Sequence, residues 1–348
     1  MDTKASTFRL IHHTLREYLC TQCNLFPQAQ LVVAETCLTY LNSDQAKALP
    51  AKPQPDLSSM PFLKYCARYW AIHGKREISD LTVLLAKELL GQYENHVAAN
   101  LLFEQIWDDH DSLEGNAPSL FGGLHCASFF GMIEVRTNLL GMGDCDANQR
   151  DSAGITPLVW AARGGQGEAV ELLLRQRAVN PDEPDNRGKT PLSWATFGGH
   201  ESLVKQLLDR RDVNPDKPSN NGRTPLSRAA FMGRESVVKQ LLDRQDVDPD
   251  KPDIGGITPL AWAAWEGHEG VVKQLLNRGD VNPDKPDNKG KTPLSWAAIE
   301  GREQCSQRGS PSVFSEDEDG RRFVVPSRPP AKLPDDYTLR TSGPSVPH

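Results

Sequence analysis

The stretch Thr258-Pro-Leu-Ala-Trp-Ala-Ala-Trp-Glu-Gly-His-Glu-Gly-Val-Val-Lys-Gln-Leu-Leu276 decides the fold of this chain. Its opening Thr-Pro-Leu motif recurs at one constant interval, at Thr156, Thr190, Thr224, Thr258 and Thr292. An earlier, divergent copy begins near Leu124, which lies the same interval before Leu158. A fixed period of this length is typical of repeats that stack on one another.

Each copy predicts two short helices. Thr190 is placed to cap the first helix, and Pro191 suits its first position, where no backbone N–H is needed. Gly198-Gly199 ends that helix with a sharp turn. The second helix begins near Glu201 and carries apolar residues at helical spacing. A pair of helices this short cannot bury both of its faces, so neighbouring copies must stack.

These motifs resemble the ankyrin-repeat family: Thr-Pro-Leu, a small pair such as Ala263-Ala264, a Gly, and then Val-x-x-Leu-Leu. The period here exceeds the usual length of about 33 residues by one. The linker Asn214–Pro218 accounts for the extra residue. The resemblance implies a mainly α fold, an α-solenoid of six copies over residues 119–304. The first copy is degenerate and the last is incomplete.

The N-terminal third carries a second resemblance. Phe8-x-Leu-Ile-His-x-Thr-x-x-Glu-Tyr-Leu19 and Pro61-Phe-Leu-x-Tyr-Cys-Ala-x-Tyr-Trp70 resemble the region between the NACHT ATPase and the repeats of fungal NLR-like proteins. The resemblance implies the end of a winged-helix-like module at residues 1–48 and a helical connector at 49–118. Whether an ATPase domain lies upstream, and whether Met1 is the natural start, stay open.

The predicted elements of this third are a strand and a series of helices. The strand covers Phe8–Ile11, and one helix follows it up to Leu19. The other helices are expected at residues 28–41, 62–73, 80–90 and 94–107, with a Pro-rich linker at 50–61. In the helix at 28–41, Val32, Val33, Thr36, Cys37 and Tyr40 are predicted to share the buried face. In the helix at 62–73, Leu63, Cys66, Ala67 and Trp70 are predicted to point inward.

Composition narrows the possible functions. The net charge of −7 argues against nucleic acid as the main partner. No apolar run approaches the roughly 20 residues of a membrane helix, and no signal peptide is visible. Seven scattered cysteines suit reduced thiols inside the cell, in the cytoplasm. Residues 305–348 are rich in Ser, Pro, Arg and acids, and predict a disordered tail.

No motif predicts catalysis, a cofactor or a metal. Gly188-Lys189-Thr190 and Gly290-Lys291-Thr292 look like the end of a P-loop, but the earlier Gly is missing, so we expect a turn followed by a capping Thr. Cys20 and Cys23 lack the further ligands of a zinc site. His200 and His268 precede second helices, where family position implies structural hydrogen bonds to neighbouring turns.

Two columns of the repeat carry the functional prediction. The first column is predicted to be core, with the Arg228 guanidinium stacked on Trp194 or Trp262. Its members are Trp160, Trp194, Arg228, Trp262 and Trp296. In ankyrin repeats the second column ends the first helix on the concave face, which implies an exposed apolar stripe and a partner-binding surface. Its members are Phe129, Arg163, Phe197, Phe231, Trp265 and Ile299. The alternative is partial burial of this column against the adjacent helix.

Polar residues of the connecting fingers are predicted to rim the second column with hydrogen-bond donors. They are Asn186, Arg187, Lys189, Asn220, Asn221, Arg223, Asn288, Lys289 and Lys291. We therefore expect a protein-protein interaction module, the ligand-sensing half of an NLR-like protein. An adaptor that presents clients to a larger complex is the alternative. An enzyme in residues 1–118 has the least support, and the oligomeric state stays open.

Overall fold

The computed structural model describes residues 29–49, 60–76, 79–91, 93, 96–99, 101, 121–135, 137, 146–299, 314–316 and 322–324. Its chain forms two compact units, Met1–Asn186 and Arg187–His348. The division falls inside the predicted repeat segment rather than at residues 118 and 119. The first repeat copies therefore belong to the same unit as the N-terminal helices, and the predicted domain bounds stay a prediction.

The described part of the first unit begins with a group of helices in which α2 packs against both α4 and α5. They are α2 (Ala29–Leu41), α3 (Asp44–Lys47), α4 (Pro61–Arg76) and α5 (Asp80–Gly91). The buried face predicted for α4 is confirmed, because all four of its residues are wholly buried. The face predicted for α2 is wrong except at Cys37, which is buried. Val32 is 58 % exposed, and the buried side chains are Ala34, Cys37, Leu38 and Leu41. Apolar residues surround α2, so its periodicity could not select the side that α4 and α5 cover.

Repeat helices with defined bounds follow in the first unit, and α4 and α5 both contact the first of them. They are α7 (Gly123–Phe130), α9 (Pro157–Arg163) and α10 (Gly167–Leu174). Helix α9 packs between α7 and α10. The N-terminal helices thus join the repeats directly.

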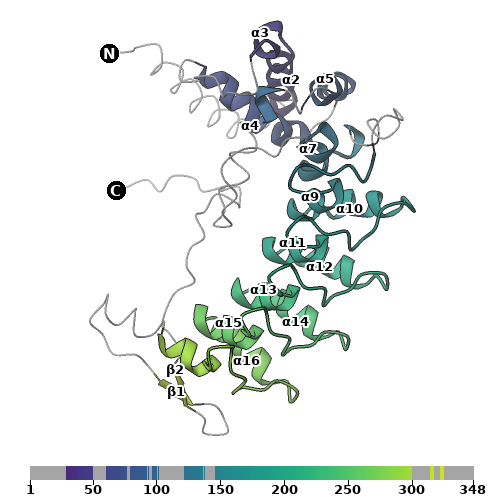
Figure 1. The fold of residues 1–348 in the computed structure, drawn as a ribbon. Helices are drawn as coiled ribbons and strands as arrows, with labels where there is room; N and C mark the ends of the chain where they lie inside the picture. The colour runs from purple at the N-terminus through teal and green to yellow at the C-terminus, as the bar shows by residue number, and fades with distance from the viewer. Residues whose placement is uncertain are drawn as a thin grey trace, which may run out of the picture. The chain divides into compact units, whose positions relative to one another are not determined.

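The second unit holds consecutive helix pairs (Figure 1). They are α11 (Pro191–Gly198), α12 (Glu201–Leu208), α13 (Pro225–Phe231), α14 (Glu235–Leu242), α15 (Pro259–Glu266) and α16 (Glu269–Leu276). The first helices α11, α13 and α15 pack in one row, and the second helices α12, α14 and α16 pack in another. Residues 293–299 form a further first helix. The fold is mainly α, and these copies stack in sequence order, as the period predicts.

Each first helix begins as its motif predicts. The Thr190 hydroxyl accepts a hydrogen bond from the backbone N–H of Ser193 at 3.2 Å, and Pro191 occupies the first helical turn. Thr224 caps α13 in the same way, at 3.1 Å from the N–H of Ser227. Gly188, just before Thr190, has a φ of +75°. The Gly-Lys-Thr sequence is therefore a turn and a helix cap, as predicted.

The linkers after the second helices tie each copy to the one before it. The Lys251 ammonium donates to both the carbonyl and the carboxylate of Asp216, each at 2.9 Å. Arg278 donates to the carbonyl of Leu242 at the end of α14, at 2.6 Å, and is paired with Asp280 at 2.6 Å. Arginine in the next copy thus satisfies an orphan carbonyl at the preceding helix end.

The fingers are the turns that precede each Thr-Pro-Leu motif, and they are joined by backbone hydrogen bonds. The N–H of Asn220 donates to the carbonyl of Arg187 at 2.9 Å, and the N–H of Ile254 donates to that of Asn221 at 3.1 Å. Gly222 at this junction has a φ of +78°, and a Cβ on it would lie 2.7 Å from the Ile254 nitrogen. The position requires glycine both for its backbone angle and for its space.

Gly222→Ala is expected to lower the free energy of unfolding by about 1 to 3 kcal/mol, because it strains a left-handed residue and pushes neighbouring fingers apart. Urea unfolding followed by tryptophan fluorescence measures the change. The control is Gly279→Ala, where a methyl group would meet no atom within 4 Å. Equal stability of the two variants would contradict the finger geometry.

In the tail the structure describes a two-stranded antiparallel ribbon that the sequence did not predict. Strand β1 (Phe314–Glu316) pairs with β2 (Arg322–Val324), and Phe314 lies opposite Val324. The predicted strand and helix at residues 8–19, most of the helix at 94–107 and the other tail residues lie outside the described ranges. Among the helices within those ranges, none has the length and apolar character that crossing a bilayer requires.

Candidate partner-binding surface

The tryptophan column forms part of the core, as predicted. Trp160 is wholly buried, Trp194 and Trp262 are each 4 % exposed, and Trp296 is half-buried. The indole N–H of Trp160 donates to Oδ2 of Asp151 at 3.0 Å. A buried indole N–H needs such an acceptor, so the carboxylate is part of the tryptophan site.

The acceptors form a column of their own, which the sequence prediction missed. The carboxylate of Asp253 accepts the N–H of Trp262 through Oδ2 at 3.2 Å, and two backbone N–H groups through Oδ1. The signal was present in the sequence, because this residue stands nine positions before each member of the tryptophan column. The pairs are Asp151 and Trp160, Asp185 and Trp194, Ser219 and Arg228, Asp253 and Trp262, and Asp287 and Trp296. Among the five copies with the Thr-Pro-Leu motif, the carboxylate is lost only in the copy that lacks the indole.

Arg228 breaks the column and is buried, with 7 % exposure. Its guanidinium carbon lies 5.1 Å from the centre of the Phe197 ring. The ring contact found for Arg228 is therefore with Phe197, and its stacking on Trp194 or Trp262 stays a prediction. Phe197 ends the preceding first helix, and its ring reaches the next copy, where the guanidinium replaces an indole. Ser219 takes the place of the carboxylate, and its hydroxyl donates to the Arg223 carbonyl at 2.9 Å.

Restoring the missing pair is expected to stabilise the chain only when both residues change together. Arg228→Trp alone buries an indole N–H whose carboxylate is missing. The double change S219D/R228W rebuilds the arrangement of Asp253 and Trp262. We expect its free energy of unfolding to exceed that of R228W by about 1 to 3 kcal/mol. Urea unfolding of the four proteins of the cycle gives the coupling. If S219D changes the free energy of unfolding equally in the wild-type chain and in R228W, the proposed pairing of positions 219 and 228 is wrong.

The second column is half-buried in every described copy, so it is not the exposed stripe that the resemblance implied. The ring of Phe231 lies 5.3 Å from that of Trp262, and the ring of Trp265 stacks at 4.6 Å on Trp296. In the first unit, Phe129 contacts Trp160 at 5.8 Å. Each of these side chains ends the first helix of one copy and covers the tryptophan of the next copy. The two columns thus meet between copies, and the alternative of partial burial describes this contact.

The predicted rim of donors is only partly available. Lys189 is 6 % exposed, because its ammonium lies 4.6 Å above the centre of the Trp194 ring; its prediction as an accessible rim donor is wrong. Lys291 lies 4.2 Å above Trp296 and is half-buried. Cations stack on indoles in this way. Lys289 is exposed and Arg187 is half-buried, so both remain candidates.

The finger asparagines are also used within the fold. The Asn186 amide donates to the carbonyl of Ser152 at 3.1 Å, and the Asn288 amide donates to that of Ile254 at 2.8 Å. Ile254 itself, at the equivalent finger position, is 72 % exposed. These asparagines therefore join neighbouring fingers.

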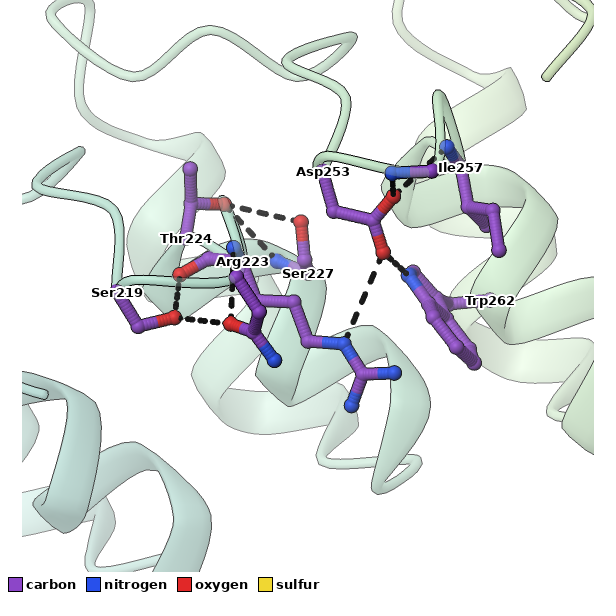
Figure 2. Close-up of polar contacts among 9 residues, drawn as sticks. Ser219, Arg223, Thr224, Ser227, Asp253, Ile257 and Trp262 are labelled. Atoms are coloured by element: carbon purple, nitrogen blue, oxygen red, sulfur yellow. Dashed lines mark hydrogen bonds and ion pairs between the residues drawn. The ribbon is translucent and has the colours of Figure 1, made fainter. Parts of the chain in front are cut away.

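Arg223 has the position that Lys189 and Lys291 have in their copies, but its own copy lacks the indole. It reaches the next copy, where its guanidinium carbon lies 4.0 Å from the centre of the Trp262 ring. Figure 2 shows the side chain extended toward Asp253, whose Oδ2 lies 3.7 Å from Nε. The copy that holds Trp262 has Ile257 at the cation position. One arginine thus supplies the cation that this tryptophan lacks.

The histidine before α16 has the structural role that was predicted for it. The ring of His268 donates from Nε2 to the Phe231 carbonyl at 2.9 Å. Burial lowers the pKa of His268, so the ring is neutral and suited to this bond. Within the described ranges no group of His, Cys, Asp and Glu is arranged to hold a metal ion. Cys20 and Cys23 lie outside those ranges.

Comparison with known families identifies the class of protein that this fold defines. The family described as ankyrin repeats (3 copies) matches residues 124–217, 179–253, 202–285 and 245–307. These overlapping matches cover more than half of the 348 residues, and the chain belongs to the ankyrin-repeat family. Comparison with curated proteins finds no match. Ankyrin repeats form a protein-protein interaction fold.

Proposed function

We propose that the chain binds a protein partner through the face formed by its fingers and first helices, where the second column lies. The observation that carries the proposal is the partial exposure of Phe197, Phe231 and Trp265 in register on successive copies. One side of Phe231 and of Trp265 packs on the next copy, and the remaining area is available to a ligand. Half-exposed aromatic rings held rigidly are the residue type that dominates binding energy.

In the second unit, Ile299 also belongs to the second column and is half-buried. Phe129 and Arg163 hold the equivalent repeat positions in the first unit, and each is half-buried. Arg187, Arg223 and Lys289 supply cations beside it, whereas Lys189 is buried over the Trp194 ring. Rings supported from behind lose little conformational freedom on binding, so such a face suits an extended or helical segment of another protein.

Site-specific photocrosslinking tests the proposal. A benzophenone amino acid at Phe231 is expected to crosslink a protein from cell extract that the same group at Lys239 does not. Lys239 is exposed on α14, in the row of second helices. Thermal unfolding of each variant shows that it is folded. Equal crosslinking from both positions would remove the finger and first-helix face as the binding surface.

The resemblance of the N-terminal third supports a more specific proposal, that this chain is the sensing half of an intracellular NLR-like protein of a fungus. Helix α4 carries the Pro-Phe-Leu-x-Tyr-Cys-Ala-x-Tyr-Trp motif of that resemblance. The Tyr65 ring on α4 contacts Tyr69 at 4.9 Å. The genomic sequence upstream of Met1 tests the context. A P-loop in the same reading frame would support it, and an unrelated gene directly upstream would refute it.

A further inference from the structure

Charge is unevenly distributed over the second unit. The finger face comprises residues 187–199, 219–231, 253–266 and 287–299, that is, the fingers and first helices. Its basic residues are Arg187, Lys189, Arg223, Arg228, Lys289 and Lys291, and its acidic residues are Asp253, Glu266 and Asp287. Six basic against three acidic residues leave an excess of three positive charges, although the whole chain carries −7.

Two of the three carboxylates on the finger face are turned toward the protein. Asp253 accepts the Trp262 indole and two backbone N–H groups, and its side chain is 6 % exposed. Asp287 is 8 % exposed and accepts the backbone N–H groups of Lys289 and Lys291, each at 2.8 Å. Lys189 and Arg228 are also buried. The accessible charge is therefore mainly positive, because Arg187, Arg223, Lys289 and Lys291 remain against Glu266.

Arg223 is the residue of this face best placed to hold an anion. Its guanidinium lies over Trp262 and 5.5 Å from the centre of the Phe231 ring, and its side chain remains 24 % exposed. Only Nε faces Asp253; Figure 2 shows both terminal nitrogens directed away from that carboxylate. Among the described residues, no hydrogen-bond acceptor pairs with these two nitrogens. Two parallel N–H groups in this fork match a carboxylate.

We propose that the finger face binds an acidic peptide segment of a partner protein, with one carboxylate held by the Arg223 fork and a neighbouring apolar side chain against Phe231 and Trp265. The inference rests on the proposed function and specifies its ligand. Stacking on Trp262 fixes the guanidinium before the ligand arrives, so little side-chain freedom is lost on binding. Lys289 and Lys291, on the finger that follows Ile254, extend the positive charge along the same row.

A displayed library of random peptides, selected on the immobilised full chain, tests this inference. The selected peptides are expected to be enriched in Asp and Glu next to apolar residues. Two substitutions test the anchor. Arg223→Gln removes the charge. Arg223→Lys keeps a cation over the indole, as Lys291 does, but removes the fork. Each should weaken the selected peptides by about tenfold or more. The control Lys205→Gln, on the exposed side of α12, should change binding less than about twofold.

The outcomes separate the inference from the function it rests on. Two results would overturn the proposal of an acidic ligand. In the first, the selected peptides lack acidic residues. In the second, acidic peptides bind R223Q and R223K as tightly as they bind wild type. The surface proposal would survive if those peptides still lost affinity in F231A. Peptides that bind equally to wild type and F231A would overturn the surface itself. The chain has an acidic run of its own, Glu316-Asp317-Glu318-Asp319. If acidic peptides bind only after these four residues are neutralised by E316Q, D317N, E318Q and D319N, the ligand is this run and not a partner.

Discussion

Trp262→Ala is expected to lower the free energy of unfolding by about 3 to 5 kcal/mol, the largest effect of any single substitution proposed for this chain. The indole is 4 % exposed and has neighbours on every side. Phe231 lies edge-on at 5.3 Å, Trp265 stacks at 5.2 Å, and Arg223 lies 4.0 Å above the ring. Removing the indole leaves a cavity between copies. It also deprives the Asp253 carboxylate of the indole N–H that donates to it.

Trp262→Phe separates the ring from its hydrogen bond. Phenylalanine keeps most of the stacking but loses the N–H that donates to Asp253, so a smaller loss of about 1 to 3 kcal/mol is expected. Lys239→Ala, at an exposed position of α14, should change stability by less than about 0.5 kcal/mol. Urea unfolding of the full-length variants measures all three. Equal losses in W262F and W262A would show that the ring itself contributes nothing.

Acid is expected to destabilise the first unit through His125. The ring is wholly buried, Nε2 donates to the Gln149 carbonyl at 2.9 Å, and Nδ1 accepts the N–H of Gly122 at 3.0 Å. Acceptance by Nδ1 requires the neutral ring, because a protonated imidazole has N–H groups at both nitrogens. Burial lowers the pKa of His125 to about 4, from 6.5 in the unfolded chain. Its contribution is therefore complete above pH 6.5 and is lost as the pH falls toward 4, by about 3 kcal/mol in total.

Asp151 acts in the opposite direction over nearly the same pH range. Burial raises the pKa of Asp151 to about 6, against 3.8 in the unfolded chain. The folded state then takes up a proton before the unfolded state does, so this contribution increases as the pH falls from 6 to 3.8. It also amounts to about 3 kcal/mol. The wild-type chain should show little net change from this pair of residues.

Two variants separate these opposing contributions. Relative to wild type, H125N should gain stability as the pH falls from 6.5 to 4, and D151N should lose it. Each difference should approach about 3 kcal/mol, because comparison with wild type cancels the other titrating groups. Urea unfolding at intervals of pH supplies the differences. A difference that does not vary with pH in either variant would show that the residue does not titrate as its burial predicts.

Local motifs predicted the elements of the repeats because the determinants lie within one copy. Thr190 and Pro191 begin α11 wherever the helix packs, and the constant period brings equivalent helices into rows. The buried face of α4 followed from its own spacing. The face of α2 did not, because apolar side chains occur all around this helix and only contact with α4 and α5 selects the buried side.

The binding surface depended on contacts between copies. Phe231 and Trp265 occupy one column and Trp262 and Trp296 another, so nothing local shows that each ring covers a partner in the following copy. The sequence predicted Lys189 to be an accessible hydrogen-bond donor, yet its side chain is buried over Trp194.

The sequence by itself determined the helices, their caps and the order in which the copies stack. Those features depend on backbone angles and apolar spacing within a single copy. Only the tertiary structure decided which side chains remain exposed. Exposure depends on what the next copy places against them, and Arg223 shows the reason: it lies over Trp262, an indole of the following copy.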